Sequence, residues 1–358
     1  MSRYRGGMVL EELVLAGLRI SFQRTCRVPY DRVNRLPAGL GPFPIYRVAD
    51  YKSSVPKEWD REGFFIPMYP QEAMWINFPQ RHFFSQPYAV VVAAGHINAI
   101  TGEEIATTKT GRLVIKLEEP QNYLVVPPQP WLDGWKSIDG KVYQFVAAEL
   151  GSGETVESQL TGKEEFGGIQ FGIFTPKPSK RLVIESRPRE YVVSGGWPPS
   201  TSSFNLNDVL NPTRGAEQMK AANLTLMGLG RGGAIEQKIY PDPYGLDVWN
   251  KRPAERVVVY IVNSEGFREI TGHQPPPTPV THEEYQRMGL PWFGVWDEDK
   301  ADSPGSEGFD GLKPVGGTKR PNKKGKGGGK PQLEDVIIPP KEAPPLPLDD
   351  VVIPPQEK

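Results

Sequence analysis

The chain of 358 residues contains a single cysteine, Cys26. One thiol excludes a disulfide within the chain and a zinc site built from several thiolates. No arrangement of histidine and asparagine that is typical of a cysteine nucleophile surrounds Cys26 in the sequence. We therefore interpret Cys26 as a small, partly buried side chain without a catalytic role.

Sequence patterns for metal binding are also missing. The four histidines form no H-x-x-H or H-E-x-x-H pair, and we interpret them as ordinary surface residues. Asp242 and Asp247 lack the glycine and the distal glutamate of an EF-hand calcium loop. We predict no metal site and no cofactor.

The sequence contains no long apolar run. Leu13–Leu18 is too short for a membrane span or for the core of a signal peptide, and Glu11 and Glu12 interrupt the apolar residues before it. Lysine and arginine number 42 against 43 acidic residues, so the whole chain has no field that attracts nucleic acid or an anionic membrane. We predict a soluble, cytoplasmic protein with neither a membrane span nor a specific nucleic-acid partner.

Proline and glycine are abundant, with 38 residues each. This composition favours many short elements joined by tight turns, and the predicted fold is mainly β with a sandwich-like body. One clear helix start is Thr281, where Glu284 completes the pattern of a capping box, and we expect that helix to end by Gly289. Apolar or alternating runs predict strands at residues 64–69, 73–78, 113–117, 141–147 and 168–174.

One stretch, Tyr88–Glu103, returns as a looser copy at Val257–His273. In each copy, β-branched residues that suit a buried strand precede the sequence Ile-Thr-Gly, whose glycine can form a turn. The repetition predicts two related lobes or two paired central strands.

Changes in composition divide the chain into four parts. Residues 1–178 are predicted as a β-rich lobe, and residues 179–220 as an irregular insertion or interlobe loop. Residues 221–297 are predicted as a second β-rich lobe with one short helix. Residues 298–358, rich in proline, glycine and lysine, are predicted as a disordered tail.

Gly228, Gly230 and Gly233 match the G-x-G-x-x-G pattern of dinucleotide-binding sites. Such a site requires a helix directly after the glycines, with its N-terminus facing the pyrophosphate. Pro241 and Pro243 end the available segment too soon. The match therefore favours a hairpin or a glycine-lined contact.

Several tryptophans lie beside acidic and turn residues, and one such stretch, Trp131–Trp135, is predicted as a loop. Aromatic faces next to carboxylates are typical of carbohydrate sites, because rings stack on sugars and carboxylates accept hydroxyl hydrogen bonds. The alternative is that the same rings fill the core. The candidate ligand-binding residues are Trp75, Trp131, Asp133, Trp135, Asp242 and Asp247.

A glycoside hydrolase would require two carboxylates that face each other across a cleft. Candidates by neighbourhood are Glu72, Asp133, Asp242 and Asp247. Convergent carboxylates in a tryptophan-lined cleft, one of them with a raised pKa, would favour an enzyme. Tryptophan rings buried in the core would favour a binding or scaffold protein.

The tail contains a repeat, in which Leu333–Pro340 recurs as Leu348–Pro355. In each copy acidic residues precede a β-branched triplet followed by two prolines, and such a segment can join a sheet edge or lie in an apolar groove. Alternatively, the tail only solubilises the protein, and we interpret its basic run, Lys319–Lys330, as solvated. The predicted partner-binding residues are Val336, Ile337, Ile338, Val351, Val352 and Ile353.

Six motifs of the chain resemble those of a family of uncharacterised bacterial proteins, some of which are labelled integral membrane proteins. The resemblance covers about Leu18–Trp296 and leaves out the tail. It implies no activity, and the lack of a spanning segment disagrees with the membrane label. The motifs are Gly39–Pro44, Glu72–Trp75, Gln129–Gly134, Phe166–Gln170, Tyr240–Gly245 and Gly289–Phe293.

These observations predict a non-enzymatic binding or scaffold protein whose tail repeats recruit a partner protein. The alternative is a carbohydrate-binding protein or a glycoside hydrolase that uses an acidic, tryptophan-lined cleft.

Overall fold

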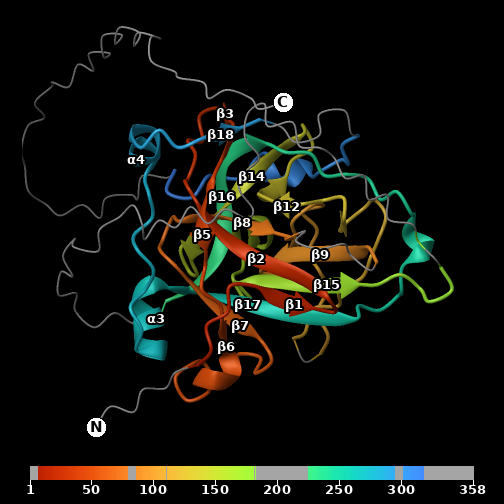
Figure 1. The fold of residues 1–358 in the computed structure, drawn as a ribbon, viewed down its shortest axis with the longest axis horizontal. Coiled ribbons are helices and arrows are strands. Elements are labelled where there is room, and N and C mark those ends of the chain that lie inside the picture. Colours follow the sequence, from red (N-terminus) through yellow and green to blue (C-terminus); the bar gives the residue numbers. More distant parts are fainter. Residues whose placement is uncertain are drawn as a thin grey trace, which may run out of the picture. The chain divides into compact units, whose positions relative to one another are not determined.

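The computed structural model describes residues 7–79, 86–109, 111–180, 182, 225–294 and 301–317. Strands far outnumber helices among these residues, so the fold is mainly β, which confirms the predicted fold class (Figure 1). The strands are β1 (Leu13–Leu15), β2 (Leu18–Thr25), β3 (Val33–Asn34), β4 (Leu36–Pro37), β5 (Gly39–Pro42), β6 (Tyr46–Arg47), β7 (Phe64–Met68), β8 (Ala73–Asn77), β9 (Tyr88–Ala94), β10 (Ile97–Asn98), β11 (Leu124–Val126), β12 (Trp131–Leu132), β13 (Gly134–Lys136), β14 (Lys141–Glu149), β15 (Ile169–Phe174), β16 (Leu226–Glu236), β17 (Glu255–Asn263) and β18 (Trp292–Phe293). The helices are α1 (Val156–Thr161), α3 (Ser264–Thr271) and α4 (His282–Arg287), with 3-10 turns at Val48–Tyr51, Leu246–Val248 and Glu307–Phe309.

One sheet of 16 strands contains every strand of the described residues except β4 and β18, which pair with each other. Its main path runs β1-β2-β8-β14-β16-β17-β15-β9-β10. Phe22 of β2 and Phe171 of β15 are several strands apart on this path, yet their ring centroids lie 5.9 Å apart. The sheet therefore curls around a core to which strands from both ends of the path contribute.

The two predicted lobes are not separate, which corrects the predicted boundary at residue 178. β16 and β17, from the second predicted lobe, lie between β14 and β15 of the first and pair with them. Because strand pairs are the unit of sheet stabilisation, neither segment has a complete sheet alone. Apart from residues 179, 180 and 182, the predicted insertion at residues 179–220 lies outside the described residues.

Both copies of the repeated stretch form strands beside the same neighbour. β9 and β17 lie on either side of β15, so they share a partner and are not themselves paired. The Ile-Thr-Gly that follows ends in a turn at Gly102 in one copy and at the end of α3 at Gly272 in the other. Both glycines have positive φ angles, 71° and 74°, which glycine adopts without steric penalty. The repeat thus reflects two similar strands followed by different structures.

The glycine motif lies inside β16, so the match to a dinucleotide-binding turn is accidental. A Cβ atom on Gly230 would lie 2.4 Å from the carbonyl oxygen of Glu154, and one on Gly233 would lie 2.3 Å from that of Pro29. Neighbouring backbone approaches this strand too closely for a side chain. The glycine-lined contact predicted from the sequence is confirmed, whereas no hairpin forms at these glycines.

Two local predictions are wrong. Residues 113–117 form no strand, because Leu113 makes only an isolated bridge to Thr107 while its side chain is buried in the cluster around Trp249. The stretch predicted as a loop, Trp131–Trp135, instead contains β12 and most of β13. The apolar run at 113–117 reflects burial without strand pairing, whereas residues 131–135 pair with β8 and β14 despite the turn residues among them.

The helix predicted at Thr281 is confirmed as α4. Thr281 Oγ1 accepts from the Glu284 N–H, and the Glu284 carboxylate accepts from the Thr281 N–H, which completes the capping box. The helix ends before Gly289, whose φ is 63°. In the part of the chain that the structure describes, no helix has the length and apolar character needed to cross a membrane.

The first part of the predicted disordered tail is folded, which corrects its start at residue 298. Residues 301–317, which we call the strap, pack on the rest of the folded chain, which we call the body. Phe309, Leu312 and Val315 of the strap are buried, and the Phe309 ring centroid lies 5.3 Å from that of Trp135. The polar, glycine-rich composition concealed these three anchors, which recur every third residue.

Polar groups of the body hold both halves of the strap. Lys136 Nζ donates to Asp302 Oδ2 over 2.6 Å, and Ser137 Oγ donates to Asp310 Oδ1 over 2.6 Å. Burial lowers the pKa of Lys136, and the Asp302 carboxylate opposes that shift. The strap therefore supplies the carboxylate that makes a buried lysine tolerable.

Replacing Phe309 with alanine should loosen the strap before the rest of the fold. Truncation of a buried phenylalanine costs about 3–5 kcal/mol, and each 1.4 kcal/mol changes an equilibrium about tenfold. We expect amide hydrogen exchange in residues 303–315 to accelerate by about two powers of ten, with β9 and β15 unchanged. Lys313→Ala, on the exposed side of the strap, is the control. Equal exchange in Phe309→Ala and Lys313→Ala would refute the anchoring role of Phe309.

Candidate functional site

The structure does not gather the six predicted ligand-binding residues into one cleft. Trp131 and Asp133 lie together at the junction of β12 and β13, and Trp75 packs against Trp131 from β8. Trp135 lies in the main core, while Asp242 and Asp247 belong to the segment after β16.

Asp133 lies where the chain passes from one strand pairing to another, because β12 pairs with β8 and β13 pairs with β14. The indole Nε1 of Trp131 donates to Asp133 Oδ2 over 2.8 Å, and the Asp133 N–H donates to Gln237 Oε1 over 3.0 Å. Burial raises the pKa of Asp133 to about 7, and the hydrogen bond from Trp131 opposes the rise. This shift meets one of the two conditions for an acid catalyst.

The second condition, a converging carboxylate, is not met by the partners of Asp133 in the described ranges. Its side chain accepts from an indole, and its N–H donates to a carboxamide. The raised pKa therefore follows from complete burial and not from a neighbouring negative charge.

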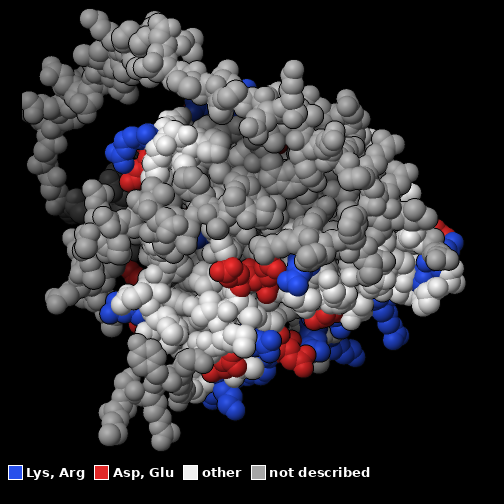
Figure 2. All heavy atoms as spheres, viewed as in Figure 1, with Lys and Arg blue, Asp and Glu red and all other residues white. Residues whose placement is uncertain are grey.

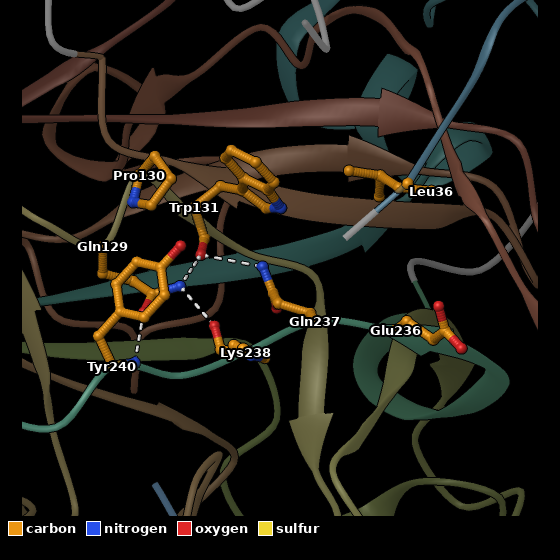
Figure 3. Close-up of a pocket in the computed structure, with 9 residues that line it drawn as sticks. Leu36, Gln129, Pro130, Trp131, Glu236, Gln237, Lys238 and Tyr240 are labelled. Atoms are coloured by element: carbon orange, nitrogen blue, oxygen red, sulfur yellow. Dashed lines mark hydrogen bonds between the residues drawn. The ribbon is translucent and has the colours of Figure 1, made fainter. Parts of the chain in front are cut away.

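A cavity of about 10 Å³ lies beside Trp131 (Figure 3). Gln129 Nε2 donates to the carbonyl oxygens of Trp131 and Lys238 over 3.0 and 3.2 Å, and Gln129 Oε1 accepts from the Tyr240 N–H. Gln237 Nε2 donates to the same Trp131 carbonyl over 3.2 Å. The cavity has room for about one water molecule and is far too small for a sugar ring.

The other two predicted rings are core residues. Trp75 is 2% exposed and meets Trp131 edge to face, with ring centroids 6.3 Å apart. Trp135 is fully buried against Phe145 and Phe309. A sugar can stack only on an accessible ring face, so these contacts support the core alternative.

Asp242 and Asp247 have different environments. Asp242 Oδ2 accepts from the Tyr123 hydroxyl and from the Trp249 indole, each over 2.7 Å. It thereby joins the chain after β16 to the segment before β11. Asp247 is exposed and lies 3.5 Å from Lys180, a separation at which a surface ion pair contributes little.

Glu72, the remaining acid candidate, forms a buried ion pair with Arg24. Arg24 Nε and Nη2 lie 2.7 and 2.6 Å from Glu72 Oε1, and Glu72 Oε2 accepts from the Tyr69 N–H over 2.8 Å. Arg24 also donates to the carbonyl oxygen of Pro277 over 2.6 Å. Burial raises the pKa of Glu72, and Arg24 opposes the shift. This pair attaches the proline-rich segment before α4 to the sheet.

Sequence reasoning missed one buried titratable group, His96, which was interpreted as a surface residue but is 3% exposed. His96 Nδ1 lies 2.7 Å from Glu157 Oε1, and Nε2 lies 3.3 Å from the exposed Glu104. Burial lowers the pKa of His96, but the hydrogen bond and charge of Glu157 outweigh it and the pKa is raised. No local motif could reveal the pair, because its members are 61 residues apart.

The Glu157 carboxylate has backbone partners in addition to His96. Its carboxylate accepts the backbone N–H groups of Glu165, Phe166 and Gly167 over 3.2, 3.1 and 3.0 Å. Burial raises the pKa of Glu157, but these bonds and His96 hold it below its usual value. The pair fastens the loop before β15 to the turn after β9.

Metal chemistry finds no support in the described ranges, where no three histidine, cysteine, aspartate or glutamate side chains are arranged to hold an ion. Burial, followed by the charge of Glu283, raises the pKa of Cys26 to about 12, so the thiolate is suppressed. Figure 2 shows acidic and basic side chains interspersed on one face, in line with the net charge of −1. The predicted partner-binding residues at 336–338 and 351–353 lie outside the described residues.

The buried ion pair predicts an asymmetric response to substitution. Arg24→Ala leaves Glu72 buried without its cation and should lower the free energy of unfolding by about 3–5 kcal/mol. The double variant Arg24→Met with Glu72→Leu removes both charges. We expect its free energy of unfolding to fall by less than half of the loss in Arg24→Ala. Denaturant unfolding measures both values. A double variant as unstable as Arg24→Ala would show that packing, and not the unpaired charge, determines the cost.

The pair of His96 and Glu157 predicts a pH dependence of stability. The raised pKa of His96 contributes stability below pH 6.5 that is lost as pH rises through the folded-state pKa. The lowered pKa of Glu157 contributes stability above pH 4.5 that is lost as pH falls. We expect Glu157→Gln to cost about 2–3 kcal/mol at pH 6 and to flatten the decline between pH 6 and 8. Glu104→Gln, which changes the exposed partner of His96, should lower the free energy of unfolding at pH 6 by less than about 1 kcal/mol and should leave the decline between pH 6 and 8 in place. An unchanged slope in Glu157→Gln would exclude this pair as its source.

Comparisons of the chain with protein-family models, with curated proteins and with solved structures found no match. The resemblance to a bacterial family therefore stays a prediction.

Proposed function

We propose that this protein is a binding scaffold, in which the folded body anchors a tail and the two tail repeats recruit a partner protein. The observation that carries the proposal is the strap, because Gly316 near its end donates its N–H to Glu154 Oε1 of the body over 3.0 Å, shortly before a segment with two copies of one short motif. Two binding motifs on one chain raise avidity through effective concentration.

The contacts of the candidate catalytic acids support a structural use of these groups. Glu72 pairs with Arg24, Asp133 accepts from Trp131, and Asp242 accepts from two aromatic side chains. Each bond joins distant parts of the chain or holds a strand junction. A catalytic acid must instead direct its oxygen at a substrate.

The carbohydrate alternative receives weaker support. Trp75, Trp131 and Trp135 are each less than 10% exposed, and the cavity beside Trp131 holds about one water molecule. We therefore propose the scaffold and retain glycans only as a control ligand class.

The proposal is tested by comparing the full chain with a chain that ends at Gly317. This truncation keeps the strap, so the body retains Phe309 and the ion pair of Lys136. Proteins retained from a lysate by each chain are quantified by mass spectrometry. We expect a defined partner to be enriched only by the full chain and to be lost from the double variant Ile338→Asp with Ile353→Asp. Leu346→Asp, the same change placed between the repeats, is the matched control.

Affinity for the purified partner then tests the role of repetition. Loss of one repeat, in Ile338→Asp or in Ile353→Asp, should weaken binding by about 10²-fold, because one linked site remains. The proposal fails if the full chain and the chain ending at Gly317 retain the same proteins. It also fails if Leu346→Asp is as damaging as the repeat variants.

A further inference from the structure

The body residues that bind the strap could bind the same segment of another chain equally well. Arg231 donates to the Leu312 carbonyl oxygen, and Arg27 donates to that of Val315. The Val315 N–H donates to the Arg231 carbonyl oxygen over 2.9 Å. We call the body residues that make these and the preceding contacts the strap site. They are Arg27, Trp135, Lys136, Ser137 and Arg231, together with Tyr143, whose hydroxyl donates to Asp310 Oδ1.

The strap is joined to the sheet only weakly by backbone pairing. Its two bridges, Ser137 with Ser306 and Arg231 with Pro314, are isolated and parallel, whereas the body has continuous ladders. Segments with few backbone bonds and few buried side chains open at lower free energy than the ladders of a core. The strap should therefore detach while the body remains folded.

An empty strap site is unfavourable. Lys136, which is fully buried, would lose its carboxylate partner, and Trp135 would lose the covering ring of Phe309. Ser137 and Tyr143 would lose Asp310, which accepts from both hydroxyls over 2.6 and 3.0 Å. Unpaired buried charge and exposed aromatic surface both favour recapture of a segment with this chemistry.

We propose that the strap site of one chain takes up the strap of a second copy, so that two chains exchange residues 301–317. The occupant is a second copy because its strap supplies the two carboxylates, the aromatic ring and the backbone carbonyls at the spacing that the site already holds. Exchange of an identical element is a low-cost route to a dimer, since each contact is kept. If the tail repeats act as proposed above, an exchanged pair would present four of them, but the exchange itself does not depend on the repeats.

A disulfide trap tests the exchange. Ser137→Cys and Ser306→Cys are made in separate chains, which are mixed and oxidised with glutathione disulfide. The bridge between these positions brings them into the range that a disulfide can span, so a heterodimer forms when the strap of one chain lies in the site of the other. The native Cys26 is buried with its pKa raised to about 12, so it competes poorly for oxidation.

Two controls define the background and the fold. Gly311→Cys, whose added Cβ meets no atom within 4 Å, replaces Ser306→Cys as a strap thiol that faces away from the site. A single chain that carries both Ser137→Cys and Ser306→Cys should close the disulfide within itself, which reports that the variants fold and that the strap docks.

We expect the mixed chains to give at least about tenfold more heterodimer than the Gly311→Cys mixture, with a yield that rises with protein concentration. A synthetic peptide of residues 301–317 in excess should reduce that yield by mass action. The inference is overturned if the doubly substituted chain closes its internal disulfide while the mixture gives no more heterodimer than the Gly311→Cys control. Partner recruitment by the tail does not enter this readout, so failure of one proposal is separate from failure of the other.

Discussion

The fold depends on the close approach of several chain segments to the backbone of β16. One edge of this strand pairs with β14 along most of its length, and the other edge meets four different segments in turn. These are β17, Thr155 before α1, the strap at Pro314, and β3. Glycines at 228, 230 and 233 leave room for these approaches, because a side chain at the latter two would collide with a carbonyl oxygen. The strand therefore joins the N-terminal segment, the central sheet and the strap.

The buried polar groups complete what the strands begin. The Arg24–Glu72 pair fixes the segment before α4, the His96–Glu157 pair fixes the loop before β15, and the Lys136–Asp302 pair fixes the strap. Arg24 lies on β2, which already pairs with the strand that follows Glu72, and it adds a hydrogen bond to the Pro277 carbonyl oxygen that no ladder supplies. Burying such charges is costly when they are unpaired, so each pair allows only the correct arrangement of its two segments.

Local sequence predicted the elements better than their assembly. The strands at 64–68, 73–77, 141–149 and 169–174 and the capped helix α4 follow from residue patterns that act within a few positions. The merging of two lobes into one sheet does not, because pairing of β16 with β14 joins residues 78 to 95 positions apart and local patterns carry no information about partners. The tryptophans illustrate the limit at the site, since the same residues beside Asp133 suit a cleft or a core, and only burial distinguishes them.

The strap explains why composition misplaced the end of the folded body. Most of its residues are polar, glycine or proline, and its buried residues are Ser303, Phe309, Leu312 and Val315. Three apolar anchors suffice because the body also holds the strap with hydrogen bonds from Lys136, Ser137, Arg231 and Arg27. The strap is therefore ordered by its contacts with the body and not by a secondary-structure propensity of its own sequence. The end of the strap lies beside β16, where the Val315 N–H donates to the Arg231 carbonyl oxygen over 2.9 Å.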